Sequence, residues 1–174
     1  MIIRPATAMD AEPLAAIYGH HVLHGFGTFE EEAPDAEEME RRRLDITERG
    51  LPYLAAEADG RVLGFAYAGP YRPRAAYRFT VEDSVYVAPD AVGRGIGRAV
   101  LGAVLDACKG LGMRQVVAVI GDSGNAASIG LHRSLGFTDA GVGRSLGYKH
   151  GRWVDIVWMQ TALNGGDARG PETP

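Results

Sequence analysis

The stretch Val85-Tyr-Val-Ala-Pro-Asp-Ala-Val-Gly-Arg-Gly-Ile-Gly-Arg-Ala99 decides the fold of this chain. A β-branched run stops at Pro89, and a loop with alternate glycines then opens directly into an amphipathic segment. We expect Gly93, Gly95 and Gly97 to let the backbone take positive φ and approach a ligand closely. N–H groups at the start of the following helix can then point at one anion. The sequence therefore predicts a phosphate-binding site between a strand and a helix.

The segments on either side of this loop predict a parallel βαβ unit. Thr80 to Val87 alternates as a half-buried strand does, which places Glu82 and Tyr86 on one face. An apolar stripe runs from Ile96 to Leu111 at helical spacing. Gln115 to Ile120 is continuously apolar, as in a strand that is buried on both faces. A right-handed crossover makes the two strands parallel, and ligands of such sheets bind at the carboxyl ends of the strands.

The rest of the chain predicts antiparallel strands and helices around this unit. Asp59-Gly60, between two apolar runs, is a dipeptide favoured in tight hairpin turns. We therefore predict an α/β fold with a mixed, mostly antiparallel central sheet, one parallel pair at the ligand site and helices on both faces. Residues 1–163 form one domain, and residues 164–174, rich in Gly, Pro and charge, are predicted to be a disordered tail. The other predicted elements are strands at 2–4, 53–58, 61–68, 140–148 and 152–163 and helices at 10–25, 35–49 and 125–135.

Composition argues against several classes of protein. The chain has 174 residues, of which 46% are hydrophobic and 23% charged, enough for one buried core. The 22 acidic residues outnumber the 18 Lys and Arg, so we expect no nucleic-acid partner. A single cysteine, Cys108, excludes an internal disulfide and Cys-rich zinc sites. The first residues lack a signal-peptide pattern and no apolar run reaches the roughly 18 residues of a membrane span, so we expect a cytoplasmic protein without a membrane partner.

Three motifs suggest other functions. The glycine loop alone could be a structural turn or a dinucleotide loop, but it lacks the third glycine of the Rossmann spacing and the Lys-Ser or Lys-Thr of a P-loop. His20, His21 and His24 suggest a metal, yet no acidic residue or cysteine stands at ligand spacing within their helix, and we predict no metal site. Gly121-Asp-Ser-Gly124 mimics a serine-hydrolase signature, although Ser123 then needs a histidine partner and an oxyanion hole.

Longer motifs carry a resemblance to a known family. The GNAT N-acetyltransferase superfamily has two acetyl-CoA motifs, and this chain resembles them at Val87-Ala-Pro-Asp-Ala-Val-Gly-Arg-Gly-Ile-Gly-Arg-Ala99 and at Asn125-Ala-Ala-Ser-Ile-Gly-Leu-His-Arg-Ser-Leu-Gly-Phe137. The branch that acetylates phosphinothricin and methionine sulfoximine is similar at Thr80-Val-Glu-Asp-Ser-Val-Tyr-Val87, at the Leu131-His132 pair and at Gly151-Arg-Trp-Val-Asp155. The resemblance covers nearly the whole chain. It implies a GNAT-like fold, acetyl-CoA as co-substrate and a homodimer.

The resemblance also implies how acetyl-CoA is held. Amides from Arg94 to Ala99 bind the pyrophosphate, and the Arg94 and Arg98 side chains add charge. The exposed backbone of Val85 to Val87 pairs with the pantetheine amides like an extra strand, and one N–H polarises the thioester carbonyl. Val92 stands where the superfamily usually has Gln or Arg, so a side-chain contact is missing. The implied contacts come from Val85, Tyr86, Val87, Gly93, Arg94, Gly95, Ile96, Gly97, Arg98, Ala99 and Asn125.

Transfer of an acetyl group to an amine needs a base for the amine proton and stabilisation of the oxyanion. By resemblance, Glu82 is the base. His132 stands where many GNAT enzymes carry a tyrosine, so it protonates the leaving thiolate or relays the proton through water. The alternative for Glu82 is a solvated carboxylate on a strand, and the alternative for His132 is a histidine packed in a helix. Cys108 lies in the inward stripe of a helix, and we therefore expect direct transfer in a ternary complex without an acyl-enzyme.

The acceptor site is predicted from arginines and one aromatic residue. Guanidinium groups in the loop before Thr80 suit a carboxylate or a phosphinate, although an ordinary charged loop has the same composition. By resemblance, Phe29 is an aromatic wall of the pocket, and Lys149 or Arg152 reaches it from the last hairpin. The predicted acceptor-binding residues are Phe29, Arg72, Arg74 and Arg78.

We therefore expect an N-acetyltransferase that acts on phosphinothricin, methionine sulfoximine or methionine sulfone. The same chemistry on another amine, such as a peptide N-terminus, a polyamine or an antibiotic, is one alternative. A catalytically silent CoA-binding module is another. Apolar final strands around Trp153, Ile156 and Trp158 favour a symmetric homodimer.

Overall fold

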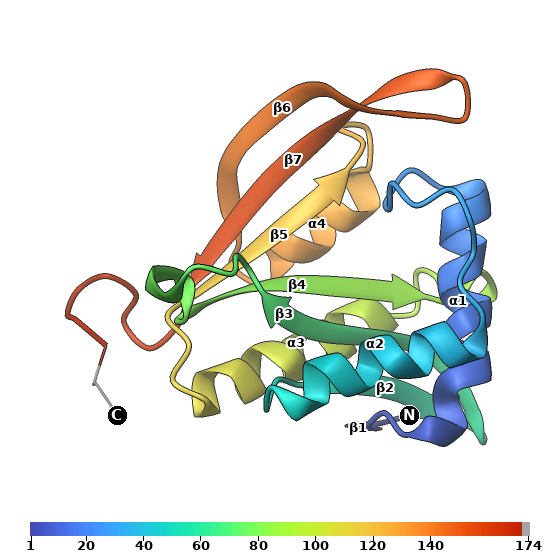
Figure 1. Ribbon diagram of the computed structural model, residues 1–174, viewed down its shortest axis with the longest axis horizontal. Coiled ribbons are helices and arrows are strands. Elements are labelled where there is room, and N and C mark those ends of the chain that lie inside the picture. The colour runs from blue at the N-terminus through green and yellow to red at the C-terminus, as the bar shows by residue number, and fades with distance from the viewer. Residues whose placement is uncertain (172–174) are drawn as a thin grey trace.

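The strands form a single seven-stranded sheet (Figure 1). The computed structural model describes residues 1–171, and within them the strand order is β1-β2-β3-β4-β5-β7-β6. In this sheet β4 and β5 run parallel, and every other neighbouring pair is antiparallel. The predicted α/β fold with one parallel pair is thus confirmed. The strands are β1 (Ile2–Pro5), β2 (Tyr53–Ala58), β3 (Arg61–Pro70), β4 (Thr80–Val87), β5 (Gln115–Gly121), β6 (Thr138–Lys149) and β7 (Arg152–Ala162).

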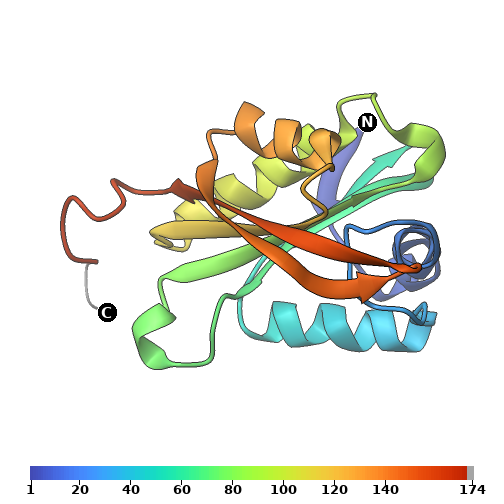
Figure 2. The same cartoon turned by 90° about the horizontal axis from the view of Figure 1, so that it is seen from above.

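Helices cover both faces of the sheet, as predicted (Figure 2). On one face α1 and α2 pack against each other and against β3, and on the other α3 packs on β2, β3 and β4 beside α4. Asp35 begins α2, because its carboxylate accepts a hydrogen bond from the N–H of Glu38 at 2.8 Å. Within residues 1–171, no helix is long and apolar enough to cross a membrane. The helices are α1 (Ala11–His24), α2 (Ala36–Glu48), α3 (Ile96–Gly110) and α4 (Ala126–Ser134), with short 3-10 turns η1 (Ala8–Asp10), η2 (Ala75–Tyr77) and η3 (Pro89–Ala91).

The hydrophobic core lies on both faces of β3. Residues 62–66 are all buried, which is the pattern of a strand that helices cover from both sides. The ring of Phe65 stacks on Tyr53 with 5.8 Å between centroids. Gly64 lets α3 approach, since a Cβ there would lie 3.1 Å from the Ile96 side chain. Each large apolar side chain that is fully buried contributes about 1.5–3 kcal/mol, so this packing fixes β3 and its neighbour β4.

The two parallel strands separate halfway along β4. Thr80 to Asp83 lies beside Gln115 to Ala118. Beyond this point β4 continues to Val87 along β3, and β5 continues to Gly121 along β7, so the two strands diverge (Figure 1). From Ser84 onward, one edge of β4 has no neighbouring strand in the sheet that the structure describes. This separation positions the site.

Residues 164–171, which composition predicts to be part of a disordered tail, contact the domain. The buried guanidinium of Arg114 donates to the backbone carbonyls of Gly166, at 2.9 Å, and Gly170, at 3.4 Å. A buried cation needs such acceptors, and the segment after β7 supplies them. Asn164 also donates to the carbonyls of Lys109, at 2.9 Å, and Met113, at 3.0 Å. These contacts join residues that lie far apart in the chain, so the composition of the segment does not reveal them. The last part of that prediction, residues 172–174, lies outside the described residues.

Candidate active site

A cleft of about 670 Å³ opens where β4 and β5 separate. Its lining includes Asp83 and Val87 from one face of β4 and Ser84 and Tyr86 from the other. Because successive side chains of a strand point to opposite faces, the cleft passes through the sheet. Two ligands can therefore meet in it, one from each face.

The glycine loop takes the predicted left-handed conformation at two of its three glycines. The φ angle is +80° at Gly93 and +78° at Gly95, the N-cap of α3. Gly97 instead lies in the first turn of α3, where our expectation of positive φ is wrong. A Cβ at this position would lie 3.2 Å from Leu131 and 3.4 Å from Val87. The third glycine thus allows α3, α4 and β4 to pack closely.

The first turn of α3 offers N–H groups to the cleft. The N–H of Ala99 donates to the carbonyl of Gly95 at 3.0 Å, so the expectation that Ala99 binds the anion is wrong. The N–H groups before it have no acceptor within the helix. Arg94 and Arg98 are exposed at this end of α3, and the helix dipole also favours an anion there. The available donors are those of Ile96, Gly97 and Arg98.

The edge of β4 that faces the gap carries backbone N–H groups. The N–H of Ala88 donates to the carbonyl of Leu63. The next pair in this ladder is Gly64 of β3 with Val87 of β4. Because backbone direction alternates along an antiparallel strand, the N–H groups of Val85 and Val87 point away from β3, into the gap. By the same alternation, Tyr86 directs its backbone toward β3 and its ring toward α1, which differs from its predicted role as a backbone ligand.

His21 fixes the end of β4 from α1. Its Nε2 lies 2.8 Å from the carbonyl oxygen of Val87, which can only accept, so Nε2 carries the hydrogen. Burial lowers the pKa of His21, which favours a neutral ring. The position of His21 in the histidine run is thus explained by a structural hydrogen bond. Among residues 1–171, no group of three or more His, Cys, Asp or Glu side chains is placed to hold a metal.

Glu82 lies half-buried on the face of β4 that looks toward α1 and α2. Burial raises the pKa of its carboxyl, the neighbouring Asp83 raises it further, and the charge of Arg72 opposes the rise. A raised pKa makes the carboxylate a better proton acceptor near neutral pH. Glu82 directly precedes Asp83 and Ser84, the first residues of β4 that line the cleft. Glu82 itself is not one of the lining residues, and its role as the base stays a prediction.

His132 lies on the opposite face of β4 from Glu82. Its Nε2 is 3.0 Å from Oδ2 of Asp83, and its Nδ1 is 2.7 Å from the carbonyl oxygen of Ser128. Sequence reasoning missed this partnership, because 49 residues separate the two side chains and no local pattern joins them. The sequence signal for this contact is the alternation in β4, which turns the side chain of Asp83 to the face opposite Glu82.

The three arginines before β4 take different positions. Arg72 is the one whose charge acts on the pKa of Glu82. Arg78 is held within its own segment, with its guanidinium 4.6 Å from the centroid of the Phe79 ring. Arg74 is exposed at the start of η2. Of the predicted trio, the structure therefore brings Arg72 toward the proposed base.

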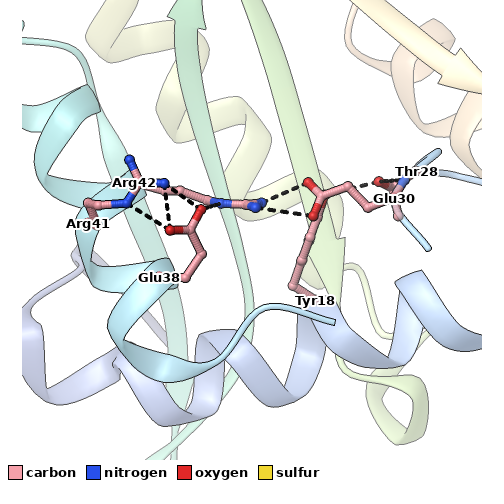
Figure 3. Close-up of polar contacts among 6 residues, drawn as sticks. All are labelled: Tyr18, Thr28, Glu30, Glu38, Arg41 and Arg42. Carbon is pink, nitrogen blue, oxygen red and sulfur yellow. Dashed lines mark hydrogen bonds and ion pairs between the residues drawn. The ribbon is translucent and has the colours of Figure 1, made fainter. Parts of the chain in front are cut away.

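An ion-pair network fixes the loop between α1 and α2 (Figure 3). Glu30 accepts hydrogen bonds from Arg42, at 2.7 and 3.1 Å, and from the hydroxyl of Tyr18, at 2.7 Å. Glu38 accepts from Nε of Arg42 at 2.6 Å and also binds Arg41. Because α1, the loop and α2 all contribute, the network sets the position of the loop. Twelve residues separate Glu30 from each partner, so helical spacing does not predict it.

The β6–β7 hairpin holds the same loop from the other side. The ring of Phe29 occupies the space that a Cβ of Gly147 would need. Lys149 is buried, and its Nζ donates to a loop carbonyl at 2.8 Å. The guanidinium of Arg152 lies 3.9 Å from the centroid of the Phe26 ring. Phe26 lines the cleft, and Lys149 and Arg152 contact the loop. Phe29 packs against Gly147 of the hairpin, and its role as a wall of the acceptor pocket stays a prediction.

Three further candidates have structural roles. The hydroxyl of Ser123 donates to Asp155 at 2.8 Å, in place of the histidine that a hydrolase requires. Asn125 lines the cleft and caps α4, because its Oδ1 accepts from the N–H of Ser128 at 3.1 Å. Cys108 is fully buried in α3, and burial raises its pKa to about 12, so the thiol stays protonated. A protonated, enclosed thiol is a poor nucleophile.

Known proteins are similar to this chain in sequence and in fold. The acetyltransferase (GNAT) family profile matches residues 18–137. Phosphinothricin N-acetyltransferase of Alcaligenes faecalis is 55% identical over 163 residues, covering 94% of this chain and 83% of that protein. The L-methionine sulfoximine/L-methionine sulfone acetyltransferase of Salmonella typhimurium is 39% identical over 168 residues, covering 94% and 95%. The structure of a GNAT superfamily phosphinothricin acetyltransferase from Sinorhizobium meliloti in complex with AcCoA matches with a TM-score of 0.95 and 45% identity, covering 98% of this chain and 92% of that one.

Proposed function

This chain belongs to the GNAT acetyltransferase family and is an acetyl-CoA-dependent N-acetyltransferase. On that premise we propose which acceptor it uses and how the acetyl group is transferred. The acceptor is the primary amine of a small amino-acid-like molecule, namely phosphinothricin, methionine sulfoximine or methionine sulfone. The relatives that are 55% and 39% identical are named for these acceptors. The amine attacks directly, in a ternary complex.

The observation that carries the proposal is the position of Glu82 at the point where β4 leaves β5. Its carboxyl has a raised pKa, and the nearby charge of Arg72 suits an acceptor that bears a carboxylate or a phosphinate. Ser84 and Tyr86, on the same face, line the cleft. An amine that enters from this face therefore meets a base beside an anion-binding group.

The opposite face supplies a seat for acetyl-CoA, which brings the acetyl group as a thioester. The donors at the start of α3 suit its pyrophosphate, with added charge from Arg98. The N–H groups of Val85 and Val87 point into the gap, where they can pair with an extended chain of amides. Val92 is 61% exposed and offers no polar side-chain contact, so binding here relies on the backbone.

The chain's own residues then handle the proton and exclude a covalent route. Glu82 takes the proton of the amine as the carbon–nitrogen bond forms, and the N–H of Val87 stabilises the oxyanion. The enclosed thiol of Cys108 does not compete for the acetyl group. Transfer is therefore a single displacement.

A panel assay of CoA release tests the proposal. Purified protein and acetyl-CoA are mixed with phosphinothricin, methionine sulfoximine, methionine sulfone, a polyamine and a peptide with a free N-terminus. We expect turnover with the first three at a kcat/KM that exceeds the others. Turnover confined to the polyamine or the peptide contradicts the acceptor, and tight acetyl-CoA binding without any turnover contradicts the enzyme itself.

The proposal includes a cytoplasmic homodimer. β6 is an edge strand of the sheet, and its hairpin exposes large apolar side chains, as an interface between copies does. Of the residues predicted for the interface, Trp153 is exposed, while Ile156 and Trp158 are half-buried. Light scattering that shows only monomer at assay concentration contradicts the dimer. The exposed apolar side chains of the hairpin are Val142, Leu146, Tyr148 and Trp153.

A further inference from the structure

Asp83 and His132 form a buried pair, and the transfer proposed above assigns no role to Asp83. The exposed fractions are 5% for Asp83 and 2% for His132, yet both line the cleft. The second carboxylate oxygen of Asp83, Oδ1, is buried without a hydrogen-bond partner in the described chain. A buried, half-paired carboxylate is costly for stability, which is typical of functional positions.

The geometry fixes how many protons the pair holds. The carbonyl of Ser128 can only accept, so Nδ1 of His132 carries a hydrogen. Nε2 and Oδ2 of Asp83, 3.0 Å apart, need one hydrogen between them. The pair therefore shares one proton, either as imidazolium with carboxylate or as imidazole with carboxylic acid. Its net charge is zero in both forms.

We infer that Asp83 is a positioning residue that orients His132 and keeps this shared proton ready for the sulfur that leaves during transfer. The inference rests on the proposed acetyl transfer. Burial lowers the pKa of His132, but the hydrogen bond and charge of Asp83 and the carbonyl of Ser128 outweigh it and raise the pKa. The pair thus keeps its proton at a pH where a free imidazole has lost it.

With this pair, every proton that moves in the reaction is accounted for. As the amine forms its bond to the carbonyl carbon, Glu82 accepts the proton that nitrogen loses. The carbon–sulfur bond breaks with its electrons on sulfur, and the shared proton of Asp83 and His132 moves to sulfur. Glu82 then returns a proton to solvent, and the pair takes one up. The net change is amine plus thioester to amide plus thiol.

Few other titratable groups act on the pair. Cys108 faces Asp83 from α3, and its pKa of about 12 keeps the thiol neutral through the pH range of an assay. Glu82 neighbours Asp83 in β4 but points to the other face. The ring of Phe137 meets His132 edge-on at 5.0 Å and carries no charge. An alkaline limb in the rate profile therefore reports the pair itself.

The test is a substitution that removes the shared proton and keeps the size of the side chain. In Asp83→Asn, the amide can donate to Nε2 and hold the ring, but it has no acidic proton. We expect kcat to fall about 10- to 100-fold, less than the roughly 10²- to 10⁴-fold that a general acid contributes because His132 stays in place, and the alkaline limb of the kcat profile to disappear. Acetyl-CoA affinity stays within about twofold of wild type, because no cofactor contact is lost.

A matched control is Asp10→Asn. Asp10 is also a buried aspartate, 4% exposed, and it binds Arg4 at 2.8 Å outside the cleft. This variant should lower Tm but keep kcat and both limbs of the profile. A uniform loss of kcat in Asp83→Asn, with the alkaline limb retained, makes Asp83 merely structural and overturns the inference. An unchanged kcat overturns it too.

Nitrogen-15 NMR of histidine-labelled wild-type protein gives a second readout that does not depend on a variant folding or on turnover. We expect the signals of His132 to show no transition near pH 6.5, the ordinary imidazole midpoint, and to change only at a higher pH, where the pair loses its shared proton. A His132 that titrates like a free imidazole contradicts the shared proton. If no acceptor turns over, the proposed function fails, while this titration still decides the state of the pair.

Discussion

The two faces of β4 offer different environments to neighbouring acidic residues. Glu82, on the α1–α2 face, is half-buried and senses the charge of the exposed Arg72. Asp83, on the α3–α4 face, is closed off and bound to His132. Since adjacent residues of a strand point in opposite directions, one dipeptide places a proposed base and a proposed proton donor on the two sides of one gap. The difference teaches that strand alternation, together with the separation of β4 from β5, can build both halves of a transfer site.

The largest expected effect comes from removing the base of the first face. Glu82→Gln keeps the size of the side chain but cannot accept a proton, so kcat at neutral pH should fall about 10²- to 10³-fold. Activity should recover as pH rises, because more of the acceptor is then free amine. Acetyl-CoA affinity, measured by calorimetry, should change by less than about twofold. An unaltered rate at pH 7 removes Glu82 as the base.

A smaller effect is expected at the anion-binding group of the same face. Arg72→Ala should raise the KM for phosphinothricin about tenfold, since a charge-assisted hydrogen bond is worth about 1.5–3 kcal/mol and exposure reduces it. The matched control is Arg49→Ala, which removes an exposed arginine that pairs with Asp45 on α2. Steady-state kinetics with varied acceptor compares them. Equal KM values for both variants would rule out the role of Arg72.

The smallest effect concerns the cofactor seat of the second face. Gly97→Ala places a Cβ 3.2 Å from Leu131, and overpacking of this kind costs about 1 kcal/mol, or roughly fivefold in the KM for acetyl-CoA. Gly102→Ala in the same helix meets only Leu135, at 3.8 Å, and should instead stabilise the helix by about 0.5–1 kcal/mol with an unchanged KM. Thermal melts and acetyl-CoA titrations separate the two. A similar KM shift in both variants contradicts the packing argument.

Most of the fold could be predicted from local patterns. The alternation of β4, the apolar stripe of α3 and the turn at Asp59-Gly60 are short-range signals, and the structure has the strands and helices that they predict. The positive φ at Gly93 and Gly95 follows from the same local reasoning. Each of these features depends on residues that lie close together in the chain.

The site was predictable only in part, because its remaining contacts join distant segments. The bond between Asp83 and His132 spans 49 residues, and the ion pair of Glu30 with Arg42 joins a loop to a helix. Whether a phenylalanine of the loop faces the cleft depends on its contacts with β6 and β7, so the sequence does not reveal that Phe26 lines the cleft while Phe29 packs against Gly147. Such choices are made by tertiary packing.

The measurement that tests the central claim most directly is the pH dependence of kcat for wild type, Glu82→Gln and Asp83→Asn with phosphinothricin. The raised pKa of Glu82 predicts an acid limb in wild type above the range of an ordinary glutamate. We expect Glu82→Gln to shift this limb to higher pH and to keep the alkaline limb. Asp83→Asn should lose the alkaline limb and keep an acid limb that moves to lower pH, because the charge of Asp83 contributes to the raised pKa of Glu82. If Glu82→Gln loses the alkaline limb, or Asp83→Asn retains it, the two faces of β4 do not divide the chemistry in this way.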